Sequence, residues 1–535
     1  MAKLALNSNK EWAVSWQTQW VLGVFVLALV LCPSATRLTC LLPLRVLLTV
    51  GHVAAGQQPG SAAAAATPAA ACDNSFFDPT HEALAGLCKT YSQVCFDQGH
   101  VVSYDPAYSP ANTSSEPLPK LEIEVIDGQP EGTLLQPLGS QQAAPSGLGS
   151  SSSRGGGGGA DDNGDKFRNA QNKYAPLSMR AAGVLEEGDL LRPTFSNCTA
   201  VVMWTQWVHN FGESLSHVTA RMWQLWADGR MGNGTLLALG TPAGERTRSF
   251  WPFFLQPYTV NAVMSFAELS ARTAAGAEPS HPYGRCFRTA HLCAFSDAGY
   301  FQGMYGAMQA AYHFYERRLP KPEPAATFDA GDDTLKVLIE HRNGTIRRLL
   351  NWEELVAECN SVRWELPGTS PWKKVQCRST TLGADPMHNL AAVRPADMVV
   401  IVHGSGCSNW LAMREGSALL EIRPYKFGSE QRGWSDWFYP NIAAAIEYKV
   451  HWYAINIEDE ALSTPSEREA EHVNEDHARY LRDRHTTLPF AALRTMVARV
   501  AGVGRSKAEY DKVTQPVRKH YVELAPGGKL QPIPV

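Results

Sequence analysis

Charge is scarce in this sequence. Only 19% of the 535 residues are Asp, Glu, Lys or Arg, below the quarter that is typical of soluble domains. Lys and Arg total 48 and Asp and Glu total 52, so the formal net charge is −4. This near balance provides no electrostatic footprint for nucleic acid and disfavours binding to an anionic membrane surface. Hydrophobic residues reach 44% and aromatic residues 10%, which is ample for a large buried core.

Several catalytic and metal-binding motifs are also missing. None of the eleven cysteines forms a Cys-x-x-Cys pair, so a zinc ribbon is not indicated. The chain has no Gly-x-Ser-x-Gly elbow, which an α/β hydrolase needs for its nucleophile. It has neither a Walker loop nor a convincing Asp-x-Asp motif for a metal–diphosphate complex. We therefore expect no metal site and no bound cofactor.

The first 56 residues are interpreted as a cytosolic tail and signal anchor. Residues 20–32 (WVLGVFVLALVLC) carry no charge, and with residues 13–19 they reach the length of about 20 that spans a bilayer. The alternative is a long signal peptide, cleaved after a second apolar run at residues 38–50. We favour the anchor because the amino-terminal region is long and carries tryptophan. It predicts a single-pass type II protein whose body lies in the lumen.

Cysteines and glycosylation sequons favour the same compartment. Nine cysteines follow residue 71, and several of them would pair in an oxidising lumen. Because nine is odd, at least one thiol stays free. Four Asn-x-Ser/Thr sequons occur, at Asn112, Asn197, Asn233 and Asn343. Together these features predict disulfides and glycosylation in the secretory pathway.

Composition divides the rest of the chain into six segments. The segment at 129–172 has SSSSRGGGGG at its centre and cannot bury enough apolar surface to fold, so it is expected to be a disordered insertion. In chain order the segments are a flexible stalk (57–71), a cysteine-bearing segment (72–128), the insertion (129–172), a first globular block (173–324), a second globular block (325–504) and a loose carboxy-terminal tail (505–535).

The second globular block has the clearest secondary-structure pattern. Strand-type apolar runs alternate with helix-type segments, and Asn351 with Glu354 three residues later has the form of a capping box. The expected strands are 335–340, 375–380, 398–402, 418–422 and 450–457, and the expected helical segments are 351–360, 385–396, 408–413 and 440–449. This alternation predicts a doubly wound, mostly parallel sheet. Ligands of such sheets bind outside the carboxyl ends of the strands, which draws attention to His341, Arg342 and the turn that begins at His403.

That turn, HGSGCSN at residues 403–409, joins a buried strand to a helical segment. Its two glycines let a ligand approach the backbone, and free N–H groups at a helix start suit a diphosphate. A tight structural turn is an equally strong interpretation. The turn is also similar to an esterase oxyanion loop, in which Cys407 would be the nucleophile, but the missing elbow makes this hydrolase alternative weaker.

Five stretches of the chain resemble glycosyltransferase family 61. The most specific is DMVVIVHGSGCSNWLAMREGSALLEIRPY (397–425), which resembles the family's strand, HGAGLTN turn, helix and strand ending in Glu. The other four, in the expected order, are CKTYSQVCFDQG (88–99), WVHNFGESLSHVTARMW (207–223), RCFRTAHLCAF (285–295) and VLIEHRNGTIRRLLNWEELV (337–356). The resemblance covers roughly residues 88 to 500.

This resemblance implies a fold, a reaction and a location. The fold is α/β of GT-B type, with two Rossmann-like domains facing a cleft: the acceptor domain at 173–324 and the nucleotide-sugar domain at 325–504. The reaction is an inverting, metal-independent transfer of xylose, arabinose or N-acetylglucosamine from a UDP-sugar. The acceptor is a glycan, a polysaccharide or a glycoprotein, and the enzyme is held in the Golgi or ER membrane by its anchor.

The resemblance also implies donor-binding residues. Without a metal, the leaving diphosphate needs cations and helix N–H groups. Arg342 is the first candidate cation, and Arg347 or Arg348 is the second, although a solvated surface pair is the simpler interpretation of the latter two. His403 and the backbone of Gly404, Ser405 and Gly406 would contact the nucleotide or diphosphate. Glu421 would bind ribose hydroxyls or serve as a hydrogen-bonded structural residue.

Inverting transfer needs a general base for the acceptor hydroxyl. The family places a His three residues and an Asp seven residues after an Asn, whereas counting from Asn210 finds Glu213 and His217. The two chemical types are exchanged, but a spacing of four places them on one helical face, where they could contact each other. The pair is our candidate base. The exchange also leaves open a structural pair, or a catalytically inactive lumenal homologue that binds glycans or nucleotides.

Overall fold

A computed structural model gives the fold of this chain. It describes residues 72–105, 179–182, 190, 192–205, 210–240, 250–272, 281–295, 299–329, 331–344, 346–430, 435, 438–465, 481–514 and 521–532. The described residues all belong to one compact unit, Pro68–Val535. The expected anchor, stalk and insertion, and the Asn112 sequon, lie outside the described residues. Among the helices that are described, none is both long and apolar enough to cross a membrane.

The second globular block forms a seven-stranded sheet in the order β16-β15-β12-β11-β10-β8-β9. Its strands are β8 (Thr334–Glu340), β9 (Lys374–Thr380), β10 (Met398–Val402), β11 (Ala418–Arg423), β12 (His451–Ile457), β15 (Tyr521–Ala525) and β16 (Lys529–Pro532). Every pairing is parallel except that of β15 with β16. The alternation of strands and helices predicts this sheet correctly.

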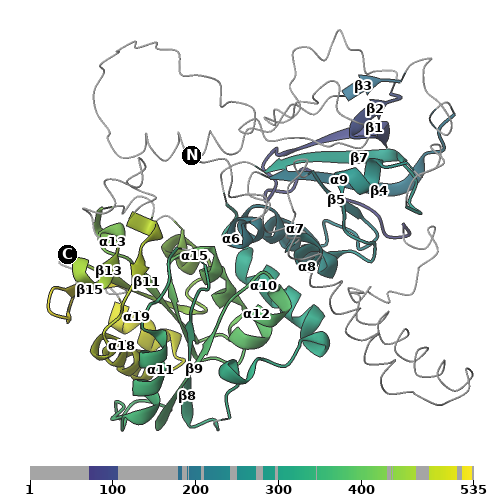
Figure 1. The fold of residues 1–535 in the computed structure, drawn as a ribbon. Coiled ribbons are helices and arrows are strands. Elements are labelled where there is room, and N and C mark those ends of the chain that lie inside the picture. The colour runs from purple at the N-terminus through teal and green to yellow at the C-terminus, as the bar shows by residue number, and fades with distance from the viewer. Residues whose placement is uncertain are drawn as a thin grey trace, which may run out of the picture. The chain divides into compact units, whose positions relative to one another are not determined.

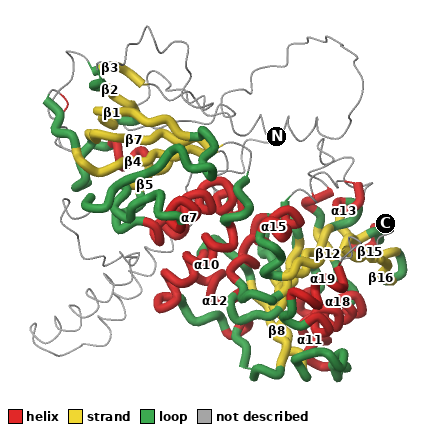
Figure 2. The backbone as a smooth tube through the Cα atoms, turned by 180° about the vertical axis from the view of Figure 1, so that it is seen from behind, coloured by secondary structure: helices red, strands yellow, loops and turns green. Residues whose placement is uncertain are grey.

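Helices cover both faces of this sheet, as Figure 2 shows. One face packs against α11, α18 and α19 through a core that includes Leu355, Leu493 and Tyr510. The other face packs against α12, η7 and α15 through a core that includes Leu390, Trp410 and Ile442. The bounds are α11 (Trp352–Ser361), α12 (Pro386–Val393), η7 (Ser405–Ala412), α13 (Phe427–Glu430), α15 (Tyr439–Ala445), η8 (Glu460–Leu462), α18 (Phe490–Val503) and α19 (Lys507–Thr514), with a two-stranded ribbon of β13 (Ser463–Thr464) and β14 (His485–Thr486).

Two expectations for this block are wrong. Asn351 does not cap α11 with its side chain. Its amide instead donates to Leu488 O at 2.9 Å and accepts from Leu488 N at 3.1 Å, so it bridges two chain segments. The carboxy-terminal tail is not loose either, because residues 521–532 extend the sheet by two strands and bury Leu524 completely.

A second sheet carries the strands that precede residue 296. Its order is β3-β2-β1-β7-β4-β5-β6. The bounds are β1 (Cys88–Asp97), β2 (His100–Ser103), β3 (Met179–Ala181), β4 (Ser196–Thr205), β5 (Leu236–Gly240), β6 (Met264–Ser265) and β7 (Cys286–Phe295). Strands β7, β4, β5 and β6 pair in parallel, whereas β1 pairs antiparallel with both β7 and β2. The described architecture is therefore α/β with two mostly parallel sheets.

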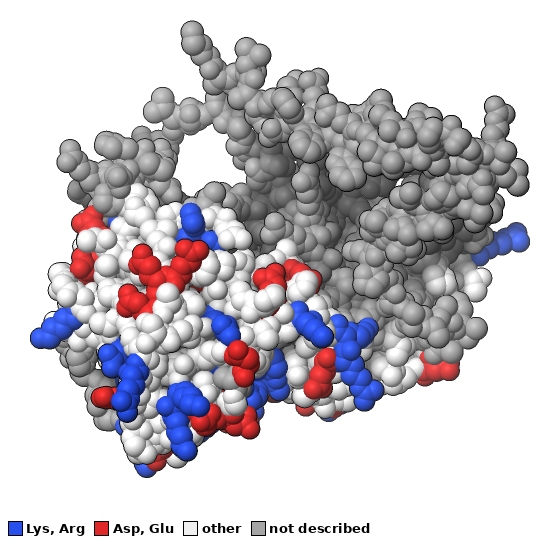
Figure 3. Space-filling view, turned by 60° about the horizontal axis from the view of Figure 1, so that its bottom comes forward, with Lys and Arg blue, Asp and Glu red and all other residues white. Residues whose placement is uncertain are grey.

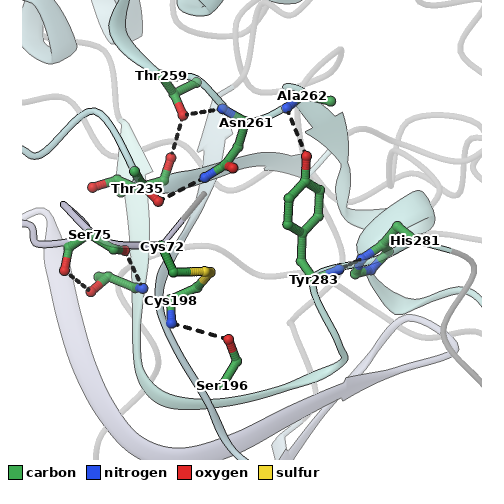
Figure 4. The surroundings of a disulfide bond; sticks show 12 residues. Cys72, Ser75, Ser196, Cys198, Thr235, Thr259, Asn261, Ala262, His281 and Tyr283 are labelled. Atoms are coloured by element: carbon green, nitrogen blue, oxygen red, sulfur yellow. Dashed lines mark hydrogen bonds between the residues drawn. A yellow bond between two sulfur atoms is a disulfide. The ribbon is translucent and has the colours of Figure 1, made fainter. Parts of the chain in front are cut away.

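Disulfides hold the cysteine-bearing segment to this mixed sheet. Cys88–Cys293 and Cys95–Cys286 join residues that face each other across β1 and β7. Cys72–Cys198 ties the segment before β1 to β4, and the neighbouring Ser75 Oγ accepts a hydrogen bond from Thr199 N at 2.5 Å (Figure 4). A fourth bridge, Cys359–Cys377, links α11 to β9. Among the described cysteines Cys407 alone is free, which confirms the predicted odd thiol.

Helices that follow strands β4, β5 and β7 of the mixed sheet also join the core of the parallel sheet (Figure 1). Phe211, Phe254 and Met308 belong to the same hydrophobic core as Trp410 and Trp452. The helical bounds are α6 (Phe211–Ser214), η3 (Leu215–Thr219), α7 (Ala220–Ala227), α8 (Phe250–Leu255), η4 (Gln256–Tyr258), α9 (Phe266–Ser270), α10 (Met304–Tyr315), η5 (Glu316–Arg318) and η6 (Pro324–Ala326). Segments α6, η3 and α7 follow one another without a break, so residues 211–227 form one helix with a π-helical turn.

Candidate functional site

The candidate site lies at the switch point of the parallel sheet. Strand β8 pairs with β9 on one side and with β10 on the other. The chain therefore runs from β8 to the neighbouring β9 and then crosses over to β10 on the opposite side of β8. A crevice forms outside the carboxyl ends of strands at such a point. Arg342 follows β8, and His403 follows β10. Both of these residues, which the sequence analysis singles out, therefore follow adjacent strands at the switch point.

Two guanidinium groups converge on Gly404. A Cβ atom at this position would lie 2.5 Å from Arg342 Nη2 and 2.8 Å from Arg347 Nη1. The φ of Gly404 is +154°, a conformation that side-chain-bearing residues rarely adopt. Arg342 Nη2 also donates to Val402 O at 3.4 Å. Glycine is needed here because both guanidinium groups occupy the space that any side chain would fill.

Each arginine has a carboxylate beside it, buried in Glu340 and half-buried in Asp483. Arg342 Nε lies 3.5 Å from Glu340 Oε1, and Arg347 Nε lies 3.2 Å from Asp483 Oδ1. Burial and the nearby Arg342 lower the pKa of Arg347 to about 10. Burial raises the pKa of Glu340 to about 7, even though both arginines favour its ionised form. Two cations held this close with little solvent form a site that an anion would stabilise.

The solvated-pair interpretation of Arg347 and Arg348 is wrong for the first residue. The side chain of Arg347 is only 17% exposed and turns toward Gly404, whereas Arg348 is exposed. The φ of Arg347 is +56°, so the loop after β8 turns sharply between the two residues. Arg347 therefore joins Arg342 in the site, and Arg348 does not.

The Gly-rich turn starts a helix, although a 3₁₀ rather than an α-helix. Helix η7 begins at Ser405 with Gly404 before it, and Cys407 N donates to Gly404 O at 2.8 Å. Ser405 and Gly406 are half-buried, while the residues from Cys407 to Ala412 are buried. The part of the turn that remains accessible is therefore the part beside the two arginines.

His403 is buried and is oriented by Glu421. Its Nδ1 lies 2.5 Å from Glu421 Oε1, which leaves Nε2 as the ring nitrogen for a ligand. Burial lowers the pKa of His403 to about 4, although Glu421 favours the protonated form. The imidazole is therefore neutral at pH 7, and with Nδ1–H donated to the carboxylate, Nε2 is a hydrogen-bond acceptor.

The sequence left two roles open for Glu421, ribose binding and a structural hydrogen-bonding role, and its contacts support the structural one. It is fully buried, and its second oxygen accepts from Trp452 Nε1 at 3.0 Å. Burial acts to raise the pKa of Glu421, but Arg423 and His403 outweigh it and hold the pKa below its usual range. This carboxylate bonds His403 and Trp452, pairs with Arg423 and has no exposed oxygen, so it orients the site from behind.

Cys407 has none of the properties of a nucleophile. Its side chain is buried, and its Sγ lies 3.7 Å from Val402 O. Burial raises the pKa of its thiol far above the usual range, so the reactive thiolate does not form near neutral pH. The esterase-like interpretation of the turn is therefore not supported.

Glu213 and His217 contact each other, as their spacing predicts. Glu213 Oε2 lies 3.1 Å from His217 Nε2, and the side chains are 22% and 2% exposed respectively. His217 lies in the π-helical turn η3, and such turns are frequent at functional sites. Asn210 accepts from the backbone N–H groups of Gly212 and Glu213 and so caps this helix. Glu213 is the member of the pair that a substrate could reach.

The helix that carries this pair begins against the Gly-rich turn. A Cβ atom at Gly212 would lie 2.6 Å from Ser408 Oγ, so the backbone of α6 directly contacts η7. Glu213 is the next residue along the chain. The structure thus brings the 210–217 motif to the neighbourhood of the 403–409 turn, as one reaction centre requires.

Three residues of the site were missed by the sequence analysis. Tyr439 donates to Gly404 O at 2.6 Å, Asp483 lies beside Arg347, and Glu340 lies beside Arg342. Glu340 could have been found, because it ends the strand that precedes Arg342. Asp483 stands in no recognisable motif. The three described sequon asparagines, Asn197, Asn233 and Asn343, are exposed.

Charges of both signs are interspersed over the face of the molecule seen in Figure 3, without a large patch of one sign.

A comparison with curated proteins finds no match to the chain. A comparison with protein families finds one: residues 206–420 match the model of glycosyltransferase 61. The matched stretch contains Glu213, His217, Arg342 and the Gly-rich turn. This match supports membership of glycosyltransferase family 61 for the stretch from 206 to 420, and with it a glycosyltransferase.

Proposed function

We propose that this protein transfers a sugar from a UDP-sugar to a glycan or glycoprotein acceptor, with inversion and without a metal ion. The transferred sugar is xylose, arabinose or N-acetylglucosamine. The observation that carries the proposal is the convergence of Arg342 and Arg347 on Gly404 at the switch point. Two fixed cations beside free N–H groups match a diphosphate leaving group. We also propose the GT-B arrangement, with the acceptor side supplied by the domain of the mixed sheet.

The reaction needs three events, and the chain has residues for each. Glu213 accepts the proton of the acceptor hydroxyl while His217 holds the other side of its carboxylate. The acceptor oxygen forms a bond to C1 of the donor sugar on the face opposite the diphosphate. The bond from C1 to the diphosphate oxygen breaks, and its electron pair leaves with UDP. Arg342 and Arg347 stabilise the charge that develops there.

His403 has a different part in this scheme from the arginines. Because its imidazole is neutral, it adds no charge to the diphosphate site. Its Nε2 accepts a hydrogen bond, which suits a ribose hydroxyl or the N–H of a uracil ring. We therefore assign His403 to recognition of the nucleoside and the arginines to the diphosphate.

The location remains part of the proposal. An anchor in the first 56 residues would hold the body in the Golgi or ER lumen. The four disulfides among the described residues and the exposed sequons at Asn197, Asn233 and Asn343 support an oxidising, glycosylating compartment. Endoglycosidase sensitivity together with microscopy of the tagged chain tests this point.

The first experiment measures UDP binding and UDP release with a panel of UDP-sugars, with and without xylan, O-mannosyl peptides and glycoprotein extracts. Arg342→Ala and Arg347→Ala should each weaken UDP binding by about tenfold to a hundredfold, because each removes a charge-assisted contact. Arg348→Ala is the matched control, since this exposed neighbour should leave binding unchanged. Equal affinity in all four proteins would remove the arginine site from the proposal.

The alternative is a lumenal binding protein without catalysis. The exchange of acid and histidine in the 210–217 motif is the observation that favours it. UDP binding that depends on Arg342, combined with no turnover for any donor and acceptor pair, would support this alternative. Release of UDP with a single donor, lost in Arg342→Ala, would support the transferase and name its sugar.

A further inference from the structure

A groove with aromatic walls lies apart from the arginine site. Its volume is about 860 Å³, and its lining comes from α7, η4, α10 and the carboxyl end of α15 with the turn that follows it. Five tryptophan, tyrosine or phenylalanine side chains take part: Trp223 and Trp226 from α7, Tyr258 from η4, and Tyr305 and Phe314 from α10. None of these residues belongs to the donor site or to the Glu213–His217 pair.

Two of the aromatic rings of this groove are open to solvent. Trp226 is 42% exposed and Phe314 is 41% exposed. Large exposed aromatic side chains that cluster in one hollow indicate a binding surface, whereas single exposed hydrophobic residues are common on any protein. The ring of Trp223 lies against the backbone of Gly306, where a Cβ atom would approach it to 2.1 Å. This contact fixes the ring in one orientation before any ligand arrives.

The polar lining of the groove carries little net charge. Glu447 and Lys449 contribute one charge of each sign, and Lys449 Nζ lies 5.6 Å from the centroid of the Tyr305 ring. Gln302 and His313 add groups that can donate and accept hydrogen bonds. An anionic ligand finds no cluster of cations here. Flat aromatic faces combined with scattered hydrogen-bonding groups match the surface of an uncharged sugar chain.

Two helices connect this groove to the reaction centre. The helix at 211–227 begins against Ser408 and places Trp223 ten residues after Glu213, which is about 15 Å along its axis. Helix α15 begins at Tyr439, which binds Gly404, and its last residue, Ala445, lines the groove. The groove therefore lies about one helix length from the Gly-rich turn, too far for the reacting sugar and at a suitable distance for later units of a chain.

We propose that this groove binds an extended chain of neutral pyranose sugars and holds the distal units of the acceptor glycan. Pyranose rings with equatorial hydroxyls present flat C–H faces that stack on Trp226 and Phe314. Their hydroxyls hydrogen-bond to the polar groups along the rim. The identification of this sugar chain as the acceptor rests on the proposed transferase function, whereas the binding of a sugar chain in the groove does not.

The test is calorimetric titration of the full chain with β-1,4-linked xylose and glucose hexasaccharides and with the matching monosaccharides. The wild-type protein should bind at least one hexasaccharide and bind its monosaccharide far more weakly. Trp226→Ala and Phe314→Ala should each weaken hexasaccharide binding by about tenfold, because each removes one stacking surface. Phe76→Ala is the matched control, since Phe76 is 44% exposed and does not line the groove.

The outcomes separate this proposal from that of the donor site. UDP binding should be unchanged in Trp226→Ala, and hexasaccharide binding should be unchanged in Arg342→Ala. Failure of UDP to bind would overturn the proposed function while leaving the hexasaccharide result intact. No hexasaccharide binding by the wild type, or equal binding by the groove variants, would overturn the groove proposal. Loss of self-association in Trp226→Ala, seen by sedimentation without any glycan binding, would assign the groove to a second copy of the chain instead.

Discussion

His403 Nδ1 lies 2.5 Å from an oxygen of Glu421, a carboxylate with no exposure to solvent. The bond joins the carboxyl ends of two adjacent parallel strands, β10 and β11. It fixes the tautomer of the imidazole and presents Nε2 as an acceptor toward the ligand. The two most recognisable residues of the 397–425 stretch therefore act as one unit, in which Glu421 positions His403.

Glu421→Gln should destabilise the protein. A glutamine can accept from His403 or Trp452, but it removes the negative charge that lies 3.3 Å from the buried Arg423. Breaking a buried ion pair in this way costs about 3–5 kcal/mol of unfolding free energy. Urea denaturation measures the loss. Glu415→Gln is the control, because Glu415 is exposed and its replacement should change stability by less than about 0.5 kcal/mol.

Gly404→Ala should remove donor binding with little loss of secondary structure. The added methyl group would lie within 3.0 Å of both guanidinium groups, so Arg342 and Arg347 must move away from the position that a diphosphate would use. Overpacking of this kind should weaken UDP binding by about tenfold or more. Gly344→Ala is the control, because nothing lies within 4 Å of its Cβ position. Unchanged affinity in Gly404→Ala would show that UDP binds elsewhere.

Glu340 should make stability depend on pH. Its pKa is raised from 4.5 to about 7 in the folded chain by burial, so the folded state holds this proton more tightly than the unfolded state does. Stability should therefore fall as the pH rises from about 4.5 to about 7, by a total of about 3 kcal/mol. Below this window Glu340 is protonated in both the folded and the unfolded state, so it causes no further change of stability with pH.

Urea denaturation at pH 5 and pH 8 checks this dependence by comparing the wild type with Glu340→Gln. The glutamine variant cannot ionise, so its stability relative to the wild type should be higher at pH 8 than at pH 5. A difference between the two proteins that does not change with pH would contradict the raised pKa.

The Cys359–Cys377 bridge should contribute to stability independently of the site. It closes a loop with a sequence separation of 18 between α11 and β9. Cross-linking a loop of this length restricts the unfolded chain by about 3 kcal/mol. The double variant Cys359→Ala/Cys377→Ala should lose this amount in urea denaturation and keep its affinity for UDP. Peptide mapping under non-reducing conditions should recover the pair in the wild type.

The sequence predicts the parallel sheet well because its strands are continuous apolar runs separated by helices. Residues 398–402 are all apolar and all buried, so local pattern and tertiary environment agree. Asn351 is different, because its side chain could either cap α11 or bond Leu488. The second contact is with a residue far along the chain, so the local sequence does not predict it. The tail was missed for a related reason: β15 and β16 are short strands at the sheet edge, where partial exposure weakens the apolar signal.

The candidate site is only partly readable from the sequence. Arg342 and His403 follow strands, so the topology rule finds them. Arg347 and Arg348 look identical in sequence, and the positive φ at Arg347 decides which one turns inward. Asp483 and Tyr439 reach the site from distant segments, and no motif in their local sequence predicts this position. Tertiary contacts, rather than motifs, complete the anion site.

The Glu213–His217 pair should control turnover and leave donor binding unchanged. Removing the proton acceptor in Glu213→Gln should lower kcat by about 10²–10⁴-fold, because the acceptor hydroxyl then attacks without general-base assistance. His217→Gln should lower kcat less, since His217 is buried and acts through the Glu213 carboxylate. The KM for the UDP-sugar should stay within about twofold in both variants, because the arginines still hold the diphosphate.

Single-turnover kinetics with the donor that releases UDP checks this order of effects. Ser216→Ala is the control on the same turn, since its hydroxyl bonds only to the Glu213 carbonyl among the described contacts. A larger loss in His217→Gln than in Glu213→Gln would reverse the two roles and make the histidine the base. Full activity in both variants would exclude the pair from catalysis and require a base from another part of the chain.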